Sequence, residues 1–579
     1  MILNKVLLKS LREYKKEAVL APILVTLEVL MEVLIPFLMS NIIDIGIQNK
    51  DLGYIIRTGV ILLALAMLSL LFGALAGKYG AIAGAGYAKN LRHDVFYKVQ
   101  EFSFKNIDHF SSSSLVTRMT TDITNVQMAF MMTIRMLVRA PLMIILALLL
   151  TLAINAKIAL MLLITVPVLG FLLIFIAKRA HRYFIQVFDT YDVLNNTVQE
   201  NVNAARVVKA YVREDHEIQK FNKVSQKVFE LFTKAEKIVA FNNPVMMLVV
   251  YAVILGMVRI GGHDIIVGNM QSGQLTSVLV YAMQILSALM MASFVFVLIM
   301  IAQASTERLV EVLEEVPEME NSQDAVKEVA NGDIDFDHVN FSYSGDEGKL
   351  ALKDADLHIK SGQVVGIFGG TGSAKSTLVQ LIPRLYDVTS GSIKVGGVDV
   401  RKYDLQVLRD QVSVVLQKNV LFTGTIYDNI RWGDEQASEE EVQRVCRLAQ
   451  ADGFIQEFPA GYETMIVEGG NNVSGGQKQR LCIARALLKK PKILILDDST
   501  SAVDTKTDAL IRKAFKEEIP DTTKIIISQR VSSIEDADLI LVLDDGQING
   551  IGTSEELLKN NQIYREVYES QVKGRAENE

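Results

Sequence analysis

The sequence predicts a membrane-embedded bundle of six α-helices fused to a soluble α/β domain built around a phosphate-binding loop. Three observations support this prediction. Hydrophobic residues make up 50% of the chain, and their excess lies in the first half. Six apolar segments there are long enough to cross a bilayer, which takes about 20 residues. In the second half, apolar runs alternate with helical patterns, and one run leads into the glycine-rich stretch GGTGSAKST at Gly369–Thr377.

The length of 579 residues exceeds what a single hydrophobic core supports and indicates several domains. We expect a transmembrane domain at residues 1–316, a linker at 317–331, an α/β domain at 332–570 and a charged, disordered tail at 571–579. The formal net charge of −7 gives no support to nucleic-acid binding. Cys446 and Cys482 lie in amphipathic helical patterns and are expected to be buried apolar side chains.

The six expected spans lie near residues 18–43, 54–85, 128–153, 157–178, 238–260 and 275–301. Short loops near Asn49–Gly53, near Asn155 and at the glycine-rich Gly261–Gly273 join them in pairs, whereas the links between pairs are long, polar and rich in Lys and Arg. Basic links stay on the cytoplasmic side, so we expect a multi-pass protein of the cytoplasmic membrane with both termini in the cytoplasm. The basic segment at residues 1–17 lacks the features of a signal peptide and predicts an amphipathic elbow helix.

Each long link has a helical centre. One is Ser111–Asp122, with serines suited to cap a helix, and the other is Glu200–Glu214. A helix at the tip of such a link could dock on a soluble domain, or it could be a solvated connection. The sequence alone leaves both interpretations open.

Charged residues inside the spans are costly in hydrocarbon and should face a bundle interior or a wet cavity. Glu28 and Glu32 lie four residues apart on one face of the first span, as a site for cationic cargo or as a structural contact between helices. Arg135 and Arg139 open the third span, and we expect them to anchor it at the cytoplasmic interface. Methionines in spans five and six fill the core or line an adaptable pocket.

In the α/β domain, six strand-like runs alternate with helices and predict a largely parallel sheet. They are Ile334–Phe341, Val364–Phe368, Val412–Leu416, Ile493–Leu496, Lys524–Ile527 and Leu539–Leu543.

The loop at Gly369–Thr377 has the chemistry of a phosphate cradle. Backbone amides of a glycine-rich turn and a helix N-terminus converge on an anion, and the helix dipole adds positive charge. Lys375 is placed to reach the β- and γ-phosphates, and the Ser376 hydroxyl to bind Mg²⁺. The expected nucleotide contacts from this loop are Gly369, Gly370, Thr371, Gly372, Ser373, Ala374, Lys375, Ser376 and Thr377.

Other residues complete a site for ATP and Mg²⁺. The strand ILILDD ends in Asp497, suited to hold Mg²⁺ through water, and in Asp498, where a hydrolytic site keeps its general base. The sequence VSGGQ places Ser474, Gly475, Gly476 and Gln477 at a second helix N-terminus, another anion-binding device. Gln417 ends a strand, and Tyr343 could stack on an adenine ring.

With these motifs in this order, the chain resembles a half-transporter of the ATP-binding cassette (ABC) exporter family over essentially its whole length. The matching motifs are Tyr343 as A-loop, Gly369–Thr377 as Walker A, Gln417 as Q-loop, Val473–Gln477 as signature, Leu494–Asp498 as Walker B and Ser501–Asp504 as D-loop. The resemblance implies coupling helices in the two long links and two halves that sandwich two ATPs head-to-tail. It also implies catalytic roles for Asp498, Gln529 and Gln417, and Mg²⁺ binding by Ser376, Gln417 and Asp497.

Three positions depart from the family pattern. Asp498 stands where the family has a catalytic Glu, and Gln529 where it has a switch His, which titrates near neutral pH as Gln does not. Ala374 replaces a P-loop glycine. A base displaced by about 1 Å can cost on the order of 10²-fold in rate. The signature VSGGQ is intact.

The pattern therefore resembles the degenerate-site half of heterodimeric bacterial multidrug exporters. The expected partner is a homologous half with the Glu and the His, and the expected cargo is a drug or another hydrophobic or amphipathic compound taken from the lipid phase. A slow homodimer is the alternative at the level of assembly. Lipid flippase, peptide exporter, nucleotide-gated channel and regulatory membrane subunit are alternatives at the level of function.

Overall fold

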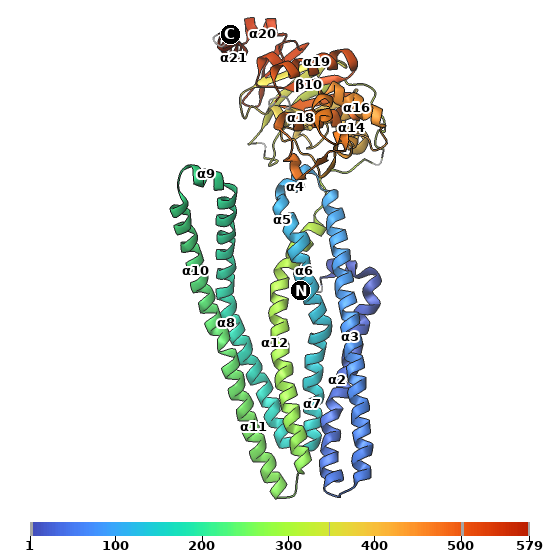
Figure 1. Ribbon diagram of the computed structural model, residues 1–579, viewed down its shortest axis with the longest axis vertical. Helices are drawn as coiled ribbons and strands as arrows, with labels where there is room; N and C mark the ends of the chain where they lie inside the picture. The colour runs from blue at the N-terminus through green and yellow to red at the C-terminus, as the bar shows by residue number, and fades with distance from the viewer. Residues whose placement is uncertain (1–3, 323, 347, 499–502, 577–579) are drawn as a thin grey trace. The chain divides into compact units, whose positions relative to one another are not determined.

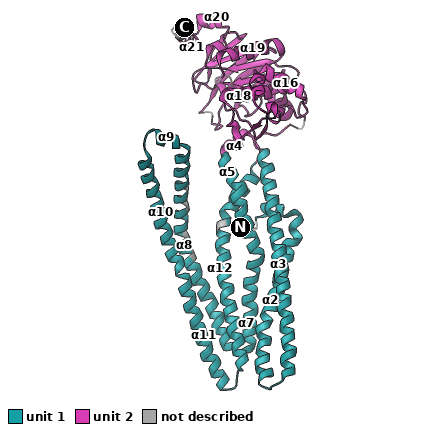
Figure 2. Cartoon of the chain, viewed as in Figure 1, with its two compact units in different colours: residues 1–101, 111–315 teal, residues 102–110, 316–579 magenta. Residues whose placement is uncertain are grey.

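The computed structural model describes residues 4–322, 324–346, 348–498 and 503–576. The chain folds into two compact units, shown in different colours in Figure 2. Unit 1 comprises Met1–Glu101 and Ser111–Glu315, and unit 2 comprises Phe102–Phe110 and Val316–Glu579. The segment Phe102–Phe110, which belongs to the expected transmembrane domain by sequence, therefore packs within unit 2.

The elements of unit 1 in the described residues are all helices. Six helical segments in this described part are long and apolar enough to cross a membrane, so the prediction of six spans is confirmed. Figure 1 shows these helices as long, roughly parallel rods, with α8 and α10 running side by side up to the short α9. The elements are α1 (Lys5–Leu8), η1 (Lys9–Tyr14), α2 (Lys15–Asn41), η2 (Ile42–Ile47), α3 (Leu52–Gln100), α5 (Ser112–Thr117), η3 (Arg118–Asp122), α6 (Ile123–Met132), η4 (Thr133–Leu137), α7 (Val138–Ile154), α8 (Ala156–Asn203), α9 (Ala205–Ala210), α10 (Glu214–Ala240), α11 (Asn242–Ile266) and α12 (Ser272–Glu314).

Side-chain caps set the sharp turns between paired spans. Asp51 accepts a hydrogen bond from the Tyr54 amide at the start of α3 (2.9 Å), and Asn155 caps α8 through the Lys157 and Ile158 amides (3.0 and 3.2 Å). Each cap satisfies amides that the first helical turn leaves unpaired. The third turn differs from the expected loop Gly261–Gly273, because α11 continues to Ile266. Gly261 lies inside α11 and allows it to pack closely on α12, since a Cβ at this position would lie 2.5 Å from Leu275.

The expected docking segment Ser111–Asp122 mostly belongs to the helical bundle. Ser111 caps α5, but Asp122 is fully buried and forms an ion pair with Arg308 of α12. Ser305 also donates to the Asp122 carboxylate (2.8 Å). A buried carboxylate needs such partners, and they tie this segment to α12. The helix that packs within unit 2 is α4 (Phe104–Phe110), just before the expected segment.

Unit 2 contains a six-stranded sheet with the order β12-β11-β3-β10-β9-β6. The four adjacent pairs from β11 to β6 are parallel, as predicted. The first expected strand, β1, instead joins an antiparallel sheet of order β2-β1-β4-β5. The sequence analysis did not recognise its partners β2 and β4. The strands are β1 (Ile334–Phe341), β2 (Leu352–Ile359), β3 (Val364–Gly369), β4 (Ser390–Val395), β5 (Val398–Asp399), β6 (Val412–Val415), β7 (Gly424–Thr425), β8 (Met465–Ile466), β9 (Ile493–Asp497), β10 (Thr523–Ile527), β11 (Leu539–Asp544) and β12 (Gln547–Gly552).

Helices cover the parallel sheet, as is general for parallel strands. Cys446 and Cys482 are free, buried and part of the hydrophobic core, as predicted. Besides α4, the helices of unit 2 are α13 (Lys375–Leu381), η5 (Val400–Lys402), α14 (Leu405–Gln411), α15 (Ile426–Arg431), α16 (Glu439–Leu448), α17 (Asp452–Glu457), η6 (Gly461–Glu463), η7 (Glu468–Gly470), α18 (Gly475–Leu488), α19 (Thr505–Glu518), η8 (Val531–Ser533), α20 (Ser554–Asn560) and α21 (Gln562–Ala576).

Two segments expected to be irregular are packed on this domain. In the expected linker, Val326 forms a bridge with Tyr403, and Val329 is buried in the core of unit 2. The expected disordered tail at 571–579 is helical in its described part, because α21 extends into it as far as Ala576. Its Gln571 bonds the backbone of the segment that follows β10, donating to Gln529 O and accepting from the Val531 amide (both 2.9 Å).

Candidate functional site

Most of the expected nucleotide-binding residues line one pocket of about 410 Å³ in unit 2. It lies at the carboxyl ends of parallel strands β3, β9 and β10, where successive loops of an α/β sheet meet and ligands usually bind. The expected residues in its wall are Tyr343, Thr371, Gly372, Ser373, Ala374, Lys375, Ser376, Thr377, Gln417, Asp497, Asp498 and Gln529.

The glycine-rich loop is held in shape by its own lysine. Lys375 Nζ donates to the carbonyl oxygens of Gly369 (2.9 Å) and Gly370 (2.6 Å). Gly369 and Gly370 do not line the pocket, but their carbonyl oxygens hold the Lys375 side chain that does. Burial lowers the pKa of Lys375, and the nearby Asp497 and Asp498 act in the opposite direction. A polyphosphate would supply the negative charge and the acceptors that Lys375 now finds in backbone carbonyls.

A hydroxyl and a carboxylate converge beside this lysine. Ser376 Oγ donates to Asp497 Oδ1 at 3.0 Å, and Asp497 is almost fully buried. Burial raises the pKa of Asp497, and the Ser376 hydrogen bond opposes that rise. A hydroxyl, a single carboxylate and nucleotide phosphates form the type of oxygen set that Mg²⁺ favours. The residues therefore fit Mg²⁺ bound together with a nucleotide.

Asp498 lies at the edge of the pocket in a constrained position. Its φ of 47° is in the left-handed region, which costs energy for a residue with a Cβ. Burial raises the pKa of Asp498, while a hydrogen bond with Gln417 and the charge of Lys375 lower it. The carboxylate therefore points to the Q-loop side chain Gln417.

Gln529 and Tyr343 close two further sides of the pocket. Gln529 is exposed, and α21 holds its backbone through Gln571. Sequence reasoning missed Gln571, because its contact with Gln529 joins positions 42 residues apart in the chain. Tyr343 is 45% exposed, and its hydroxyl forms a hydrogen bond with Thr377 Oγ1 (3.0 Å). The exposed ring is available for stacking.

The signature residues lie elsewhere on unit 2. Ser474 caps α18 by accepting a hydrogen bond from the Gln477 amide (3.3 Å), and the Gln477 side chain accepts one from the Ser474 amide (2.9 Å). Ser474, Gly475, Gly476 and Gln477 are absent from the wall of the nucleotide pocket. Of the expected D-loop, Ser501 and Ala502 lie outside the described residues, and Asp504 caps α19.

In unit 1, Glu28, Glu32 and Arg139 form one charged cluster. Arg139 Nη1 lies 2.5 Å from Glu28 Oε1, and Arg139 Nη2 lies 2.5 Å from Glu32 Oε2. The sequence analysis did not anticipate these ion pairs of Arg139, in which one guanidinium satisfies both carboxylates in an apolar bundle. Arg135 instead packs against α3, where a Cβ on Gly80 would lie 2.7 Å from its side chain.

A cavity of about 300 Å³ adjoins this cluster. Its wall includes Glu32 and Arg139 but not Glu28, which packs against Gly73 of α3. Methionines on two helices form much of the remaining wall: Met143 of α7, and Met283 and Met291 of α12.

Comparison with known proteins matches both parts of the chain. The sequence profile of the ABC transporter transmembrane region matches residues 19–289, and that of the ABC transporter domain matches residues 352–501. The chain belongs to the ABC transporter family. It is 38% identical over 97% of its length to an uncharacterized ABC transporter ATP-binding protein, YfiB, of Bacillus subtilis, 98% of which is covered.

The half-transporter is also similar to a curated flippase and to a solved exporter structure. It is 30% identical to the ATP-dependent lipid A-core flippase of Desulfotalea psychrophila, over 92% of this chain and 93% of the flippase. A solved structure of a bacterial Atm1-family ABC exporter with ATP bound superposes with a TM-score of 0.84, covering 96% of this chain and 99% of that chain at 23% identity. The chain is a multi-pass half-transporter with an exporter fold, and its ATP-binding domain couples ATP hydrolysis to transport.

Proposed function

We propose that this chain is the degenerate-site half of a heterodimeric exporter, and that its own Walker face binds ATP but hydrolyses it slowly. One observation carries the proposal. The three positions that depart from the family pattern, Ala374, Asp498 and Gln529, all line the same pocket, and the signature has no such change.

The pocket retains what binding requires and changes what hydrolysis requires. Lys375, Ser376 and Asp497 remain for the phosphates and Mg²⁺, with Gln417 as a further metal contact. Asp498 is one methylene shorter than Glu and lies in a hydrogen bond with Gln417. A misplaced general base is costly, by about 10²-fold for a displacement near 1 Å. Gln529 can donate to a γ-phosphate, but it does not titrate near neutral pH.

The partner in this proposal is a homologous half that carries the Glu and the His. Its Walker face would meet Ser474–Gln477 of this chain, while its signature completes the pocket described above. Exposed apolar residues around α9 support docking of a partner there, because such groups gain from burial. They include Val202, Val207, Tyr211 and Val212, which are 58–80% exposed.

The transport cycle in this proposal is alternating access across the cytoplasmic membrane, with termini and ATP-binding domains in the cytoplasm. ATP shifts the equilibrium because it binds the closed pair of domains better than the open pair. The helix α4 and the region around α9 would carry closure to the spans. Hydrolysis at the competent site would then reset the transporter.

The cargo in this proposal is a drug or another amphipathic compound, and the cavity beside Glu32 is its candidate contact. The cluster has two carboxylates and one guanidinium, so its local formal charge is −1. Charge inside a membrane is stabilised by partners of opposite sign, and methionines suit varied apolar shapes. These features favour a cationic group on the cargo.

The cavity assignment can be tested with a pair of dyes of equal size, one cationic and one neutral. We expect Glu32→Gln to weaken binding of the cationic dye at least tenfold and to leave the neutral dye unchanged. Glu28→Gln alters the same charge outside the cavity wall, so its effect should be smaller. Equal losses for both dyes, or an equal effect of both variants, would contradict a direct contact.

The experiment that tests the assembly is Mg-ATPase turnover of the full chain purified alone in lipid nanodiscs. Turnover near background, restored by a homologous half that carries the Glu and the His, supports the proposal. Turnover of about 1 s⁻¹ or more, against a typical enzyme value of about 10 s⁻¹, would instead support a homodimer if Asp498→Asn abolished it.

A second candidate function is lipid translocation, favoured by the relationship to a lipid A-core flippase. The same nanodiscs separate the two functions. Stimulation of turnover by lipid composition, with no response to amphipathic drugs, would favour the flippase.

A further inference from the structure

Tyr386 contacts both the candidate adenine site and the helix α4. It follows α13 and is 9% exposed. On one side its ring meets Tyr343 edge-on, with centroids 5.2 Å apart, and Phe341 at 5.6 Å. On the other side it meets Phe104 of α4 at 6.0 Å, and its hydroxyl donates to Asp108 Oδ2 at 2.7 Å. One side chain thus lies between the two elements, all within unit 2.

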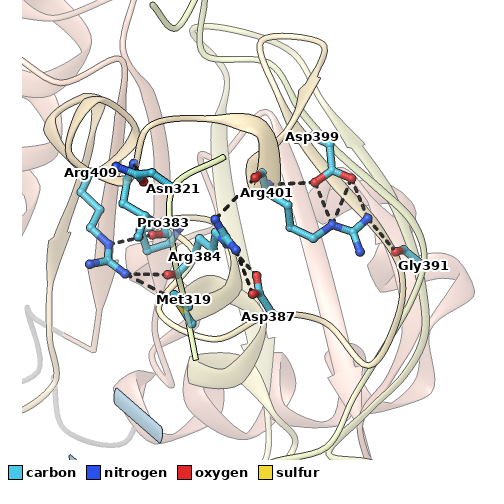
Figure 3. A network of polar contacts seen from close by, with 10 residues as sticks. Met319, Asn321, Pro383, Arg384, Asp387, Gly391, Asp399, Arg401 and Arg409 are labelled. Atoms are coloured by element: carbon cyan, nitrogen blue, oxygen red, sulfur yellow. Dashed lines mark hydrogen bonds and ion pairs between the residues drawn. The ribbon is translucent and has the colours of Figure 1, made fainter. Parts of the chain in front are cut away.

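Two arginines fix the turn that carries Tyr386. Arg384 bonds Asp387 through both carboxylate oxygens, at 2.7 and 3.0 Å. Arg409 donates to Arg384 O (2.7 Å) and Pro383 O (3.3 Å). Figure 3 shows both guanidinium groups directed at this turn. Bidentate pairs are geometrically specific, so the backbone on either side of Tyr386 is held in place.

The hydrogen bond from Tyr386 to Asp108 persists over the physiological pH range. Burial raises the pKa of Tyr386, and the neighbouring Asp108 raises it further. The phenol therefore stays protonated and remains a donor to a carboxylate, which is among the stronger hydrogen-bond types. Further contacts hold α4 itself, since Lys105 forms an ion pair with Glu318 at 2.5 Å.

We propose that Tyr386 is a positioning residue that couples occupancy of the adenine site to the helix α4. The proposal rests on the proposed stacking of adenine on Tyr343. A stacked adenine would restrain the Tyr343 ring, against which the edge of Tyr386 packs. The restrained Tyr386 then holds Phe104 and Asp108, so nucleotide binding orders α4 without any need for hydrolysis. ATP does this only as far as it binds the ordered state more tightly.

The test uses the full-length chain in nanodiscs, with hydrogen exchange of residues 104–110 measured with and without ATP. Affinity is measured in parallel with a fluorescent ATP analogue. In the unsubstituted protein we expect ATP to slow exchange in 104–110 at least threefold. Tyr386→Phe keeps the ring but loses the hydroxyl, so the affinity should stay within twofold while the slowing falls by at least half.

Further variants separate positioning from folding. Asp108→Asn retains an acceptor for the Tyr386 hydroxyl and should preserve the effect, whereas Asp108→Ala should reduce it as Tyr386→Phe does. Tyr386→Ala should weaken ATP binding as well, because Tyr343 loses its neighbour. Unchanged exchange in the core strands β3 and β9 would show that each variant is folded.

Two outcomes would overturn the inference, and they differ in what they imply. If the protein binds ATP but residues 104–110 respond equally in Tyr386→Phe and in the unsubstituted protein, the coupling role fails alone. If the unsubstituted protein does not bind ATP, the proposed function of the Walker face fails with it.

Discussion

Two helices of unit 2 begin in phosphate-binding sequences, and they begin in different ways. No side chain caps α13, which follows Ala374 in the left-handed conformation, with φ 71°. In contrast, α18 is closed by reciprocal hydrogen bonds between Ser474 and Gln477. The first turn of a helix leaves amides without partners. The first amides of α13 are therefore available to a ligand. In α18, the Ser474 side chain already accepts a hydrogen bond from the Gln477 amide.

The comparison separates binding from hydrolysis. All three departures from the family pattern lie in the pocket at α13, and the α18 sequence has none. A substitution of Asp498 should therefore change the ATPase turnover of the proposed complex little, whereas a substitution of Ser474 should lower it strongly.

The largest effect is expected at the signature. In the complex with a competent half, Ser474→Ala should lower ATPase turnover roughly 10²- to 10³-fold, the range for losing a donor to transition-state charge. Ser438→Ala is the matched control, because Ser438 caps α16 through the Glu441 amide and has no signature role. Asp498→Asn should change turnover less than twofold. A large loss in Asp498→Asn would contradict the asymmetry.

A gain of hydrolysis is expected when the Walker face is restored. Asp498→Glu together with Gln529→His should raise single-site ATP hydrolysis at this face by about 10²-fold, because the base regains its reach. Single-turnover hydrolysis of radiolabelled ATP in the complex measures it, with the partner's catalytic Glu changed to Gln. Unchanged turnover and unchanged nucleotide occupancy would count against the degenerate-site interpretation.

The residues of the α13 pocket and of the α18 signature could be predicted from the sequence because they lie in short motifs. Asp497 is the last residue of β9, and Lys375 and Gln529 lie in the segments after β3 and β10. Parallel strands bring their carboxyl ends to one edge. Contacts between distant segments were not visible. Gln571 reaches Gln529 only because α21 packs back on the domain, and Arg139 meets Glu28 across 111 residues of chain. No periodicity encodes such pairs.

The contacts of helix α4 with the rest of unit 2 also could not be predicted from the sequence. The serines of Ser111–Asp122 correctly indicated a helix cap, yet the contacts with unit 2 come from Phe104, Lys105 and Asp108. Capping is a local property that sequence reveals. The choice of which neighbouring turn packs on a domain depends on side chains such as Tyr386, more than 270 residues away.

Binding at the α13 pocket should depend strongly on Lys375. Lys375→Met removes the charge and the donors that now bond Gly369 and Gly370. Hydrogen bonds to charged groups contribute about 1.5–3 kcal/mol, so ATP affinity should fall roughly 10- to 100-fold. Equilibrium binding of a fluorescent ATP analogue measures it, with Lys394→Met as the control, because Lys394 pairs with Asp337 away from the pocket wall. An unchanged affinity would mean that the pocket does not hold the nucleotide.

The smallest effect is expected at Ala374. A residue with a Cβ costs about 1–2 kcal/mol in the left-handed region, and glycine's greater freedom in the unfolded chain offsets roughly 0.5–1 kcal/mol of the gain. Ala374→Gly should therefore raise the free energy of unfolding by about 0.5 kcal/mol. The chain's single tryptophan, Trp432, stacks on Phe422 within unit 2, so its fluorescence follows this unit during denaturation.

Gly372 is the matched control, because its φ is 84° and a Cβ there would meet nothing within 4 Å. Gly372→Ala should lower the free energy of unfolding through backbone strain alone, opposite in sign to Ala374→Gly. Opposite shifts would show that the left-handed backbone at Ala374 accounts for the stability cost of an alanine at this position. Equal signs would mean that the methyl of Ala374 makes packing contacts that outweigh the strain.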